Sequence, residues 1–420
     1  MWNYPRRTRR GKERQDKSST CWHRSSPRLA CLSPFVLFVS FVDDFFSRPF
    51  ILWENLTSDV IMRVTASHSP WRIVMLRRLP ISVCGLLLLA GIVRSGGGGP
   101  KAVPLPDGLV APNTVAEAVG IVAFLEGPAV DAAGHVFFSD IAGNRMLKMD
   151  PKGKISVFRA DSGRTNGNCF DAQGRLISCE GGEQGVGRRR IVRTDLKTGA
   201  VAILTDKYDG QRYNAPNDVC VDTKGRIWFT DPYYGPDRSH LEMDVDGVYR
   251  LDPNPQVKGG WAVTRILTQK EIQRPNGIAI TPDDKRLYVI DSHPKPGGNR
   301  MIWSFDVAAD GSLLNQCLVY NFGKGRGGDG MKLDMNGNLW VTAGISVKRG
   351  PGETLDNPPG VYIISPAGKL LGVIPIPENL ITNCAFGGPE RKTLYVTAGK
   401  TVYRIPTSVS GYALYPPLAK

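Results

Sequence analysis

The chain has 420 residues, of which 41% are hydrophobic and 22% are charged, so it is long enough to build a large core. Its formal net charge of +14 is concentrated upstream, because the first 99 residues carry 15 Lys and Arg against 6 Asp and Glu. No basic stripe with interleaved aromatic residues follows residue 100, which argues against a nucleic-acid-binding function.

The upstream part of the chain reads as a leader. Residues 1–74 are rich in Arg, Ser and Trp without a usable hydrophobic period, so we expect them to be unstructured or to precede a true start at Met75. The stretch MLRRLPISVCGLLLLAGIV has two arginines and then a short apolar run, as a secretory signal does. Residues 75–96 therefore predict a periplasmic or secreted protein. Arg94 interrupts the cleavage region, so an uncleaved N-terminal anchor stays open.

The cysteines of the folded part do not indicate a disulfide framework. Five follow residue 100, an odd number without CxxC spacing, and each lies beside a strand-like run. We expect small buried side chains at these positions. They are Cys169, Cys179, Cys220, Cys317 and Cys384.

After a predicted linker over residues 97–112, the chain repeats one unit, a polar turn with Gly followed by a short strand with aromatic residues. The copies are DAAGHVFFSD (131–140), DAQGRLISCE (171–180), DTKGRIWFTD (222–231), TPDDKRLYVID (281–291), DMNGNLWVTA (334–343) and GPERKTLYVTA (388–398). A further strand follows most copies, and no window predicts an amphipathic helix of three turns. Six such units predict an all-β fold, a six-bladed β-propeller with four-stranded blades over residues 113–410, followed by a tail over 411–420.

Polar residues recur at one position of this repeat. In a propeller the innermost strand of each blade lines the central channel, and the strand before each turn is the candidate for it. The residue at the head of that strand then faces the channel mouth. These head residues are Glu126, Asn166 with Asn168, Asn217 with Asp218, Asn276, Asp329 and Asn383. Six polar heads in phase are a stronger signal of a site than any one of them.

The ring of head residues changes the interpretation of Asp329. It lies in GGDGMKLDMNGNLWVTA, flanked by Gly327, Gly328 and Gly330. Glycines permit unusual backbone angles and close approach by other groups. Alone, an Asp in such a loop is more often a turn cap than a ligand. Its place in the ring of polar heads favours a positioned ligand or base.

Together, the motifs LEGPAVD, NGNCFDAQGRLISCE, APNDVCVDTKGRIWFTDP, RPNGIAITPDDKRLYVIDS, GGDGMKLDMNGNLWVTA and TNCAFGGPERKTLYVT resemble the gluconolactonase, senescence-marker-protein and luciferin-regenerating-enzyme family. The resemblance covers residues 115–407 and implies a six-bladed propeller with one divalent cation in its channel. It implies that Glu126, Asn276 and Asp329 are metal ligands. Asn217 is then a further ligand or a substrate contact, and Asp329 is also the residue that handles the proton.

One position departs from the family pattern. Some members have Arg two residues before the Asn of the third motif, where this chain has Ala215 in NAPND. A contact that the Arg makes to a sugar lactone is therefore missing. This departure bears on the identity of the substrate more than on the chemistry.

The donor set suits a hard cation. Two carboxylates and two amide carbonyls offer only oxygen, which favours Ca²⁺, with Mg²⁺, Mn²⁺ or Zn²⁺ as alternatives. The folded part has only His135, His240 and His293, and none is a head residue, which argues against a His/Cys zinc site. Such an ion polarises a lactone carbonyl and acidifies water, and Asp329 is the expected base.

We therefore predict a carboxylic ester hydrolase that opens a small lactone, as a monomer or dimer without a membrane domain beyond a possible N-terminal anchor. The residues expected to contact the substrate are Asn168, Asn217, Asp231, Tyr234 and Asn383. Two alternatives stay open. One is a secreted, non-catalytic propeller that binds a sugar or peptide. The other is a different esterase on the same scaffold.

Overall fold

The structure is a computed structural model. It describes residues 51–56, 59–64, 106–111, 114–121, 124–182, 186–257, 260–350 and 352–417. The chain divides into two units, Met1–Leu79 and Pro80–Lys420. In the first unit, β1 (Ile51–Leu56) and β2 (Asp59–Val64) form an antiparallel hairpin. The predicted signal segment, residues 75–96, lies outside the described residues. The described residues include no helix with the length and hydropathy that a membrane crossing requires.

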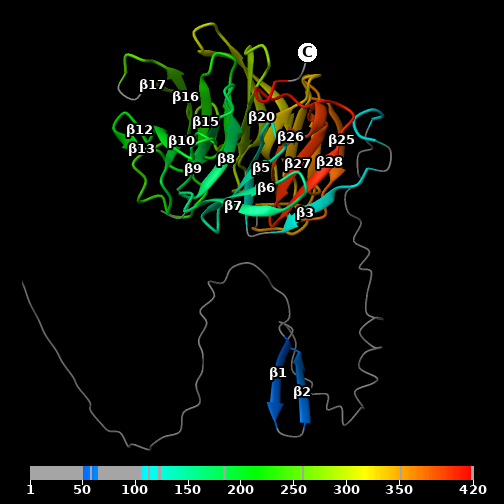
Figure 1. Ribbon diagram of the computed structural model, residues 1–420. Helices are drawn as coiled ribbons and strands as arrows, with labels where there is room; N and C mark the ends of the chain where they lie inside the picture. The colour runs from blue at the N-terminus through cyan, green and yellow to red at the C-terminus, as the bar shows by residue number, and fades with distance from the viewer. Residues whose placement is uncertain are drawn as a thin grey trace, which may run out of the picture. The chain divides into compact units, whose positions relative to one another are not determined.

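The second unit consists of antiparallel sheets, and its described residues form six four-stranded blades (Figure 1). From the innermost to the outermost strand, the first three blades are β4 (Leu125–Val130), β5 (Val136–Asp140), β6 (Arg145–Met149), β7 (Ile155–Ala160); β8 (Thr165–Phe170), β9 (Leu176–Glu180), β10 (Arg190–Thr194), β11 (Val201–Thr205); and β14 (Val219–Val221), β15 (Ile227–Asp231), β16 (Gly247–Pro253), β17 (Trp261–Leu267).

The last three blades follow in the same order. They are β18 (Pro275–Ile280), β19 (Arg286–Ser292), β20 (Arg300–Val307), β21 (Leu313–Asn321); β22 (Gly328–Leu333), β23 (Leu339–Ala343), β24 (Gly360–Ile364), β25 (Leu370–Pro375); and β26 (Ile381–Gly387), β27 (Thr393–Ala398), β28 (Thr401–Pro406), β3 (Glu117–Ile121). A two-stranded ribbon, β12 (Lys207–Tyr208) and β13 (Gln211–Arg212), and the short 3-10 helix η2 (Pro389–Arg391) complete the described elements.

The blades close into a ring. Each innermost strand packs against the innermost strands of the blades before and after it, in the order β4, β8, β14, β18, β22, β26 and back to β4. The last blade is composite, because β3 from the beginning of the unit pairs with β28 near its end. Figure 1 shows this pairing as a cyan strand beside a red one. The predicted six-bladed propeller is confirmed.

The repeated turn has a simple local cause. In the DxxG copies, Oδ1 of the Asp accepts hydrogen bonds from the backbone N–H groups two and four residues later, as Asp222 does from Lys224 and Arg226 at 3.0 and 2.8 Å. The Gly takes positive φ, 77° at Gly225, which costs little for a residue without Cβ. Oδ2 of Asp222 also accepts from the Trp228 indole at 3.0 Å. The turn therefore fixes the aromatic residue of the next strand.

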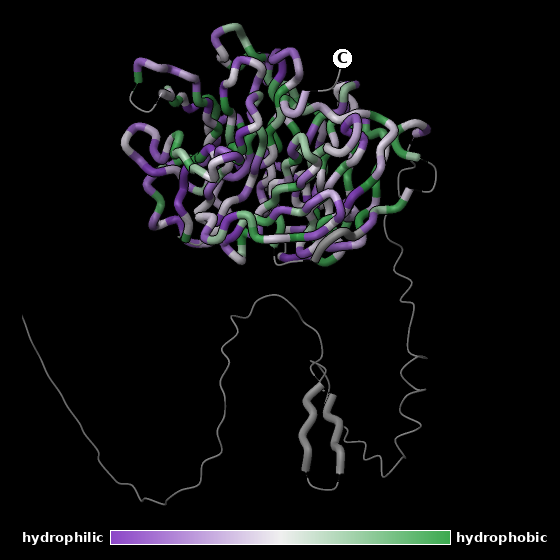
Figure 2. The backbone as a smooth tube through the Cα atoms, in the orientation of Figure 1, coloured by the Kyte–Doolittle hydropathy of each residue, from purple (hydrophilic) through white to green (hydrophobic). Residues whose placement is uncertain are grey.

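The hydrophobic core lies between the blades and within them. Trp228 of β15 and Trp340 of β23 are fully buried in such clusters. The outermost strands are more exposed, as in β7 and β21. Figure 2 shows projecting loops that are largely hydrophilic. Stacking of sheet against sheet therefore supplies the burial that no single blade could provide.

The predicted tail packs against the ring. Tyr412 N–H donates to the Leu333 carbonyl at 2.8 Å, and Arg391 donates to the Ala413 carbonyl at 2.7 Å. Tyr412 and Tyr415 also line a cavity inside the channel. These contacts lie at the ends of the innermost strands, opposite their heads. The tail therefore closes the channel on the side away from the predicted site.

Candidate active site

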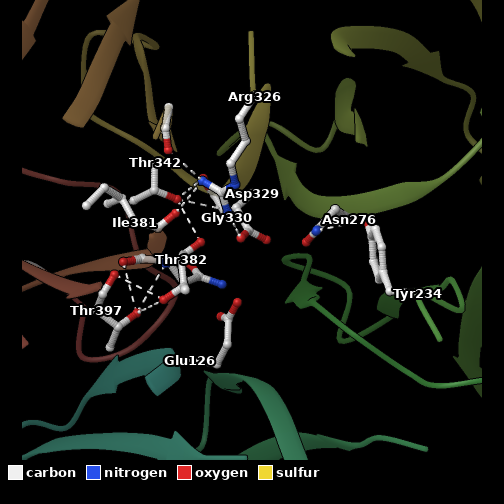
Figure 3. A network of polar contacts seen from close by, with 12 residues as sticks. Glu126, Tyr234, Asn276, Arg326, Asp329, Gly330, Thr342, Ile381, Thr382 and Thr397 are labelled. Carbon is white, nitrogen blue, oxygen red and sulfur yellow. Dashed lines mark hydrogen bonds and ion pairs between the residues drawn. The ribbon is translucent and has the colours of Figure 1, made fainter. Parts of the chain in front are cut away.

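The structure brings the predicted head residues to one end of the channel. Each lies at or directly before the start of an innermost strand: Glu126 in β4, Asn166 and Asn168 in β8, Asn217 before β14, Asn276 in β18, Asp329 in β22 and Asn383 in β26. Figure 3 shows the side chains of Glu126, Asn276 and Asp329 pointing toward one another from separate strands. The ring geometry inferred from the repeats therefore assembles them.

In the third and fourth blades, an Asp near the end of the second strand holds the segment that leads into the head residue. Asp231 accepts hydrogen bonds from the backbone N–H groups of Asn214 and Ala215, both at 2.8 Å, just before Asn217. Asp291 does the same for residues 273 and 274, before Asn276. These carboxylates are fully buried. They fix the segments of the chain that lead into Asn217 and Asn276 from the neighbouring strands β15 and β19.

Glycines after the heads allow the blades to approach closely. A Cβ at Gly127 would collide with the Asn166 carbonyl, and one at Gly277 would collide with the Asp329 carbonyl. A Cβ at Gly330 would enter the Asn383 side chain. At these three positions, which follow Glu126, Asn276 and Asp329, a larger residue would therefore push the next blade outward.

Hydroxyl groups join neighbouring blades beside the carboxylates. The Thr342 hydroxyl donates to the Thr382 carbonyl at 2.8 Å, and the Thr382 hydroxyl donates to the Leu125 carbonyl at 2.7 Å. Figure 3 shows Thr342 and Thr382 in the same network of polar contacts as Asp329. They connect the fifth, sixth and first blades, so the spacing of the two carboxylates does not depend on a loop.

The two carboxylates share a buried environment. Burial, and then the nearby Asp329 carboxylate, raises the pKa of Glu126 well above its ordinary value, and Asp218 adds to the rise. Burial also raises the pKa of Asp329, although Arg326 opposes the rise. Both groups therefore favour a compensating positive charge between them.

Two residues that the sequence did not single out complete the charge pattern. The Arg326 guanidinium donates to Oδ2 of Asp329 and, through Nη1, to the Ile381 carbonyl at 3.0 Å. Nζ of Lys332 lies 4.0 Å from Oδ2 of Asp218. Lys332 lies three residues after Asp329 in the same strand, at a position that the repeat marks, whereas Arg326 lies in a Gly-rich loop that offers no such signal.

The donor set fits a hard cation. Nδ2 of Asn276 donates to the Tyr234 hydroxyl at 3.0 Å, which leaves its amide oxygen to accept or to ligate. Together with Asn217, Glu126 and Asp329, the set offers four oxygen-bearing side chains and no sulfur or imidazole. Among the described residues, no three His, Cys, Asp or Glu side chains gather as a metal cluster. A cation here would therefore depend on amide oxygens.

The residues predicted to contact substrate lie in different surroundings. Tyr234 reaches Asn276 and lies under the Arg274 guanidinium. Asn168 is buried and donates to the Gly127 carbonyl at 2.8 Å, and Asn383 accepts from the Cys384 N–H at 2.9 Å. Asp231 is buried at the end of β15. Tyr234 is half-buried, whereas the other three side chains are buried. The substrate contacts of all four residues stay predictions.

Comparisons with known proteins show the family of this chain. A family model described as the SMP-30/Gluconolactonase/LRE-like region matches residues 124–400. A gluconolactonase from Zymomonas mobilis is 30% identical, covering 74% of this chain and 86% of the relative. A 6-deoxy-6-sulfogluconolactonase from Pseudomonas putida is 26% identical, covering 63% of this chain and 79% of the relative.

A solved structure shows the same similarity. The structure of a gluconolactonase from Xanthomonas campestris has a TM-score of 0.58 and is 30% identical, covering 75% of this chain and 99% of its own. The residues that the family model matches include strands of all six blades. The chain belongs to the SMP-30/Gluconolactonase/LRE-like family.

Proposed function

We propose that this chain is a lactonase that hydrolyses a small sugar-derived lactone with a divalent cation, Ca²⁺ first, held by Glu126, Asn217, Asn276 and Asp329. The observation that supports it best is the convergence of Glu126, Asn276 and Asp329 at the channel mouth. Family relatives from Zymomonas mobilis and Pseudomonas putida are named as lactonases, which supports the reaction class.

A bound cation would polarise the lactone carbonyl and lower the pKa of water. Asp329 acts as the base: it takes a proton from the water that attacks the carbonyl carbon. Its carboxylate is 14% exposed at the mouth, and Arg326 occupies Oδ2, so Oδ1 is the oxygen for this proton. Asp329 then returns the proton to the ring oxygen as the C–O bond breaks, and a hydroxy acid leaves.

The substrate is defined as a class. Ala215, the position at which some relatives have Arg, is buried, and its N–H is bonded to Asp231. No guanidinium therefore extends from this position toward a sugar. Tyr234 and the two Asn side chains of Asn276 and Asn217 present hydrogen-bonding groups that suit a polyhydroxylated ring. We also propose that the protein is exported to the periplasm or secreted, because residues 75–96 resemble a secretory signal peptide.

The test is hydrolysis of D-glucono-1,5-lactone by the full chain, followed as acid release at constant pH. The protein is stripped with a chelator, and Ca²⁺, Mg²⁺, Mn²⁺ or Zn²⁺ is then restored one at a time. Spontaneous hydrolysis is measured without protein and subtracted, and the Asp329→Asn variant is assayed beside the wild type. We expect activity that disappears on stripping and returns with one ion.

Other outcomes are informative. Cation binding without activity on this lactone, or on a panel of lactones and esters, would leave a binding propeller. Full activity in the stripped protein would refute the metal-dependent mechanism. Activity on simple esters but not on lactones would indicate a different esterase on the same scaffold.

A further inference from the structure

A second ring of residues lies in the channel beneath the head residues. Three positions after five of the heads, the innermost strands contribute mostly small side chains to a cavity of about 100 Å³. These positions are Ala129, Cys169, Cys220, Ala279 and Lys332, and Ala385 lines the cavity from β26. Of the described residues that line it, Lys332 alone is charged. The Ala and Cys residues leave room for its long side chain.

Lys332 reaches across the channel to a carboxylate on another blade. Lys332 belongs to β22 in the fifth blade, and Asp218 precedes β14 in the third. The two charged atoms lie 4.0 Å apart, and the side chains are 19% and 1% exposed. Oδ1 of Asp218 accepts from the Val219 N–H, but its buried Oδ2 has no hydrogen-bond partner among the described residues. Lys332 is therefore the compensating charge of this oxygen.

Asp218 also acts on the site above it. Its negative charge bears on both Glu126 and Asp329, the two carboxylates at the mouth. Three buried carboxylates would attract a dication strongly, and Asp218 could itself become a ligand. Arg326 offsets one of these charges and Lys332 offsets another. The charge balance of the site therefore includes the ammonium group of Lys332 as well as any bound metal ion.

We propose that Lys332 is a positioning residue, an internal counter-ion that keeps Asp218 away from the cation site and so weakens divalent-cation binding. This inference rests on the proposed metal-dependent function. Without the Lys332 charge, the mouth is more negative and Asp218 is free to turn toward the ion. The cation is then bound more tightly and is a poorer Lewis acid, so turnover falls although affinity rises.

The first test uses Lys332→Met, which keeps the length of the side chain and places an apolar group in a largely apolar cavity. Lys369→Met removes the same charge from an exposed position of the same blade and is the matched control. Calorimetric titration of the stripped full chain with Ca²⁺ should give a Kd roughly tenfold lower for Lys332→Met. Its kcat should fall, while the control keeps the wild-type values. An unchanged or higher Kd would overturn the proposal.

The second test does not depend on metal. In the stripped protein, Lys332→Met leaves Asp218 buried without its partner and should lower Tm by roughly 5 °C. Adding Asp218→Asn should recover most of this loss, because no unpaired charge then remains. Purely additive losses would refute the ion pair. If the wild-type chain binds no cation, the proposed function and the predicted change in Ca²⁺ affinity are both refuted. The Tm comparison would still show whether Lys332 and Asp218 form an ion pair.

Discussion

Arg326 and Asp329 form an ion pair three residues apart at the entrance to β22. The guanidinium is 7% exposed and also donates to the Ile381 carbonyl of the neighbouring blade. It thereby joins the carboxylate to the framework of two blades. Asp329 is therefore held in a fixed orientation at the channel mouth, and the proposed base role depends on that orientation.

Replacing Arg326 tests this orientation. Arg326→Met should lower kcat roughly 10- to 100-fold, because the carboxylate loses its fixed orientation. It should also lower the free energy of unfolding by about 3 kcal/mol, since a buried pair is broken. Arg326→Lys keeps the charge without the forked geometry and should be intermediate in kcat. Steady-state kinetics and urea unfolding measure both effects, and an unchanged kcat in Arg326→Met would exclude the positioning role.

Asp329→Ala removes the proposed base. Turnover should fall at least 100-fold, because general base catalysis contributes about 10²–10⁴-fold. The measurement is kcat on the lactone that the wild type prefers, with circular dichroism to establish folding. Asp310→Ala removes an exposed carboxylate from a turn and is the control. A folded Asp329→Ala protein with a near-normal rate would refute the role.

Much of the architecture follows from sequence because the repeat determines it locally. The DxxG turns and alternating strands predict the blades, and the phase of the repeat places Glu126, Asn276 and Asp329 at one end of the channel. The composite last blade could not be predicted in the same way. The pairing of β3 with β28 joins segments almost 290 residues apart, Glu117 and Arg404 for example, and no local pattern records it.

The residues around the site were less predictable than the heads. Asp231 lies at the end of a strand next to Tyr233 and Tyr234, which favours a rim position, yet it is fully buried against backbone N–H groups. Burial depends on the preceding loop of the same blade, which the pattern does not reveal. Lys332 could have been found by aligning the six innermost strands, because it stands among Ala and Cys residues.

Gly330 should tolerate no side chain. Its Cβ would enter the Asn383 side chain, which lies beside Glu126. Gly330→Ala should therefore lower the free energy of unfolding by about 1–3 kcal/mol and reduce cation affinity, because the sixth blade must shift. Gly350→Ala is the control, since a Cβ there meets no atom within 4 Å. Urea unfolding and calcium titration of both variants check the prediction, and equal behaviour would contradict it.

Ring closure should depend on β3. A chain that starts at residue 124 lacks this strand and leaves the edge of β28 unpaired, whereas a chain that starts at residue 106 keeps it. We expect the shorter chain to melt at a much lower temperature and to aggregate through the open edge. Thermal unfolding and size-exclusion chromatography compare the two. Equal Tm values would show that the last blade is stable with three strands.

Asp231 should make stability depend on pH. Burial raises its pKa from an ordinary value of 3.8 to about 8, although hydrogen bonds from the Asn214 and Ala215 N–H groups oppose the rise. The native chain therefore keeps a proton that the unfolded chain has lost. The stabilisation from this group is complete below pH 4 and is lost as the pH rises toward 8, by at most about 1.4 kcal/mol per pH unit.

Asp231→Asn isolates this contribution, because Asn is neutral at every pH and resembles the protonated carboxyl group. The variant loses one backbone hydrogen bond and should be less stable than the wild type near pH 5. Since the variant lacks the titrating group, its free energy of unfolding should change less with pH. The difference between the free energies of unfolding of the two proteins should therefore narrow as the pH approaches 8. Urea unfolding of the stripped proteins at pH 5, 6.5 and 8 measures both slopes. Parallel slopes would show that Asp231 is ionised in the native chain throughout this range, and that its two backbone N–H donors outweigh its burial.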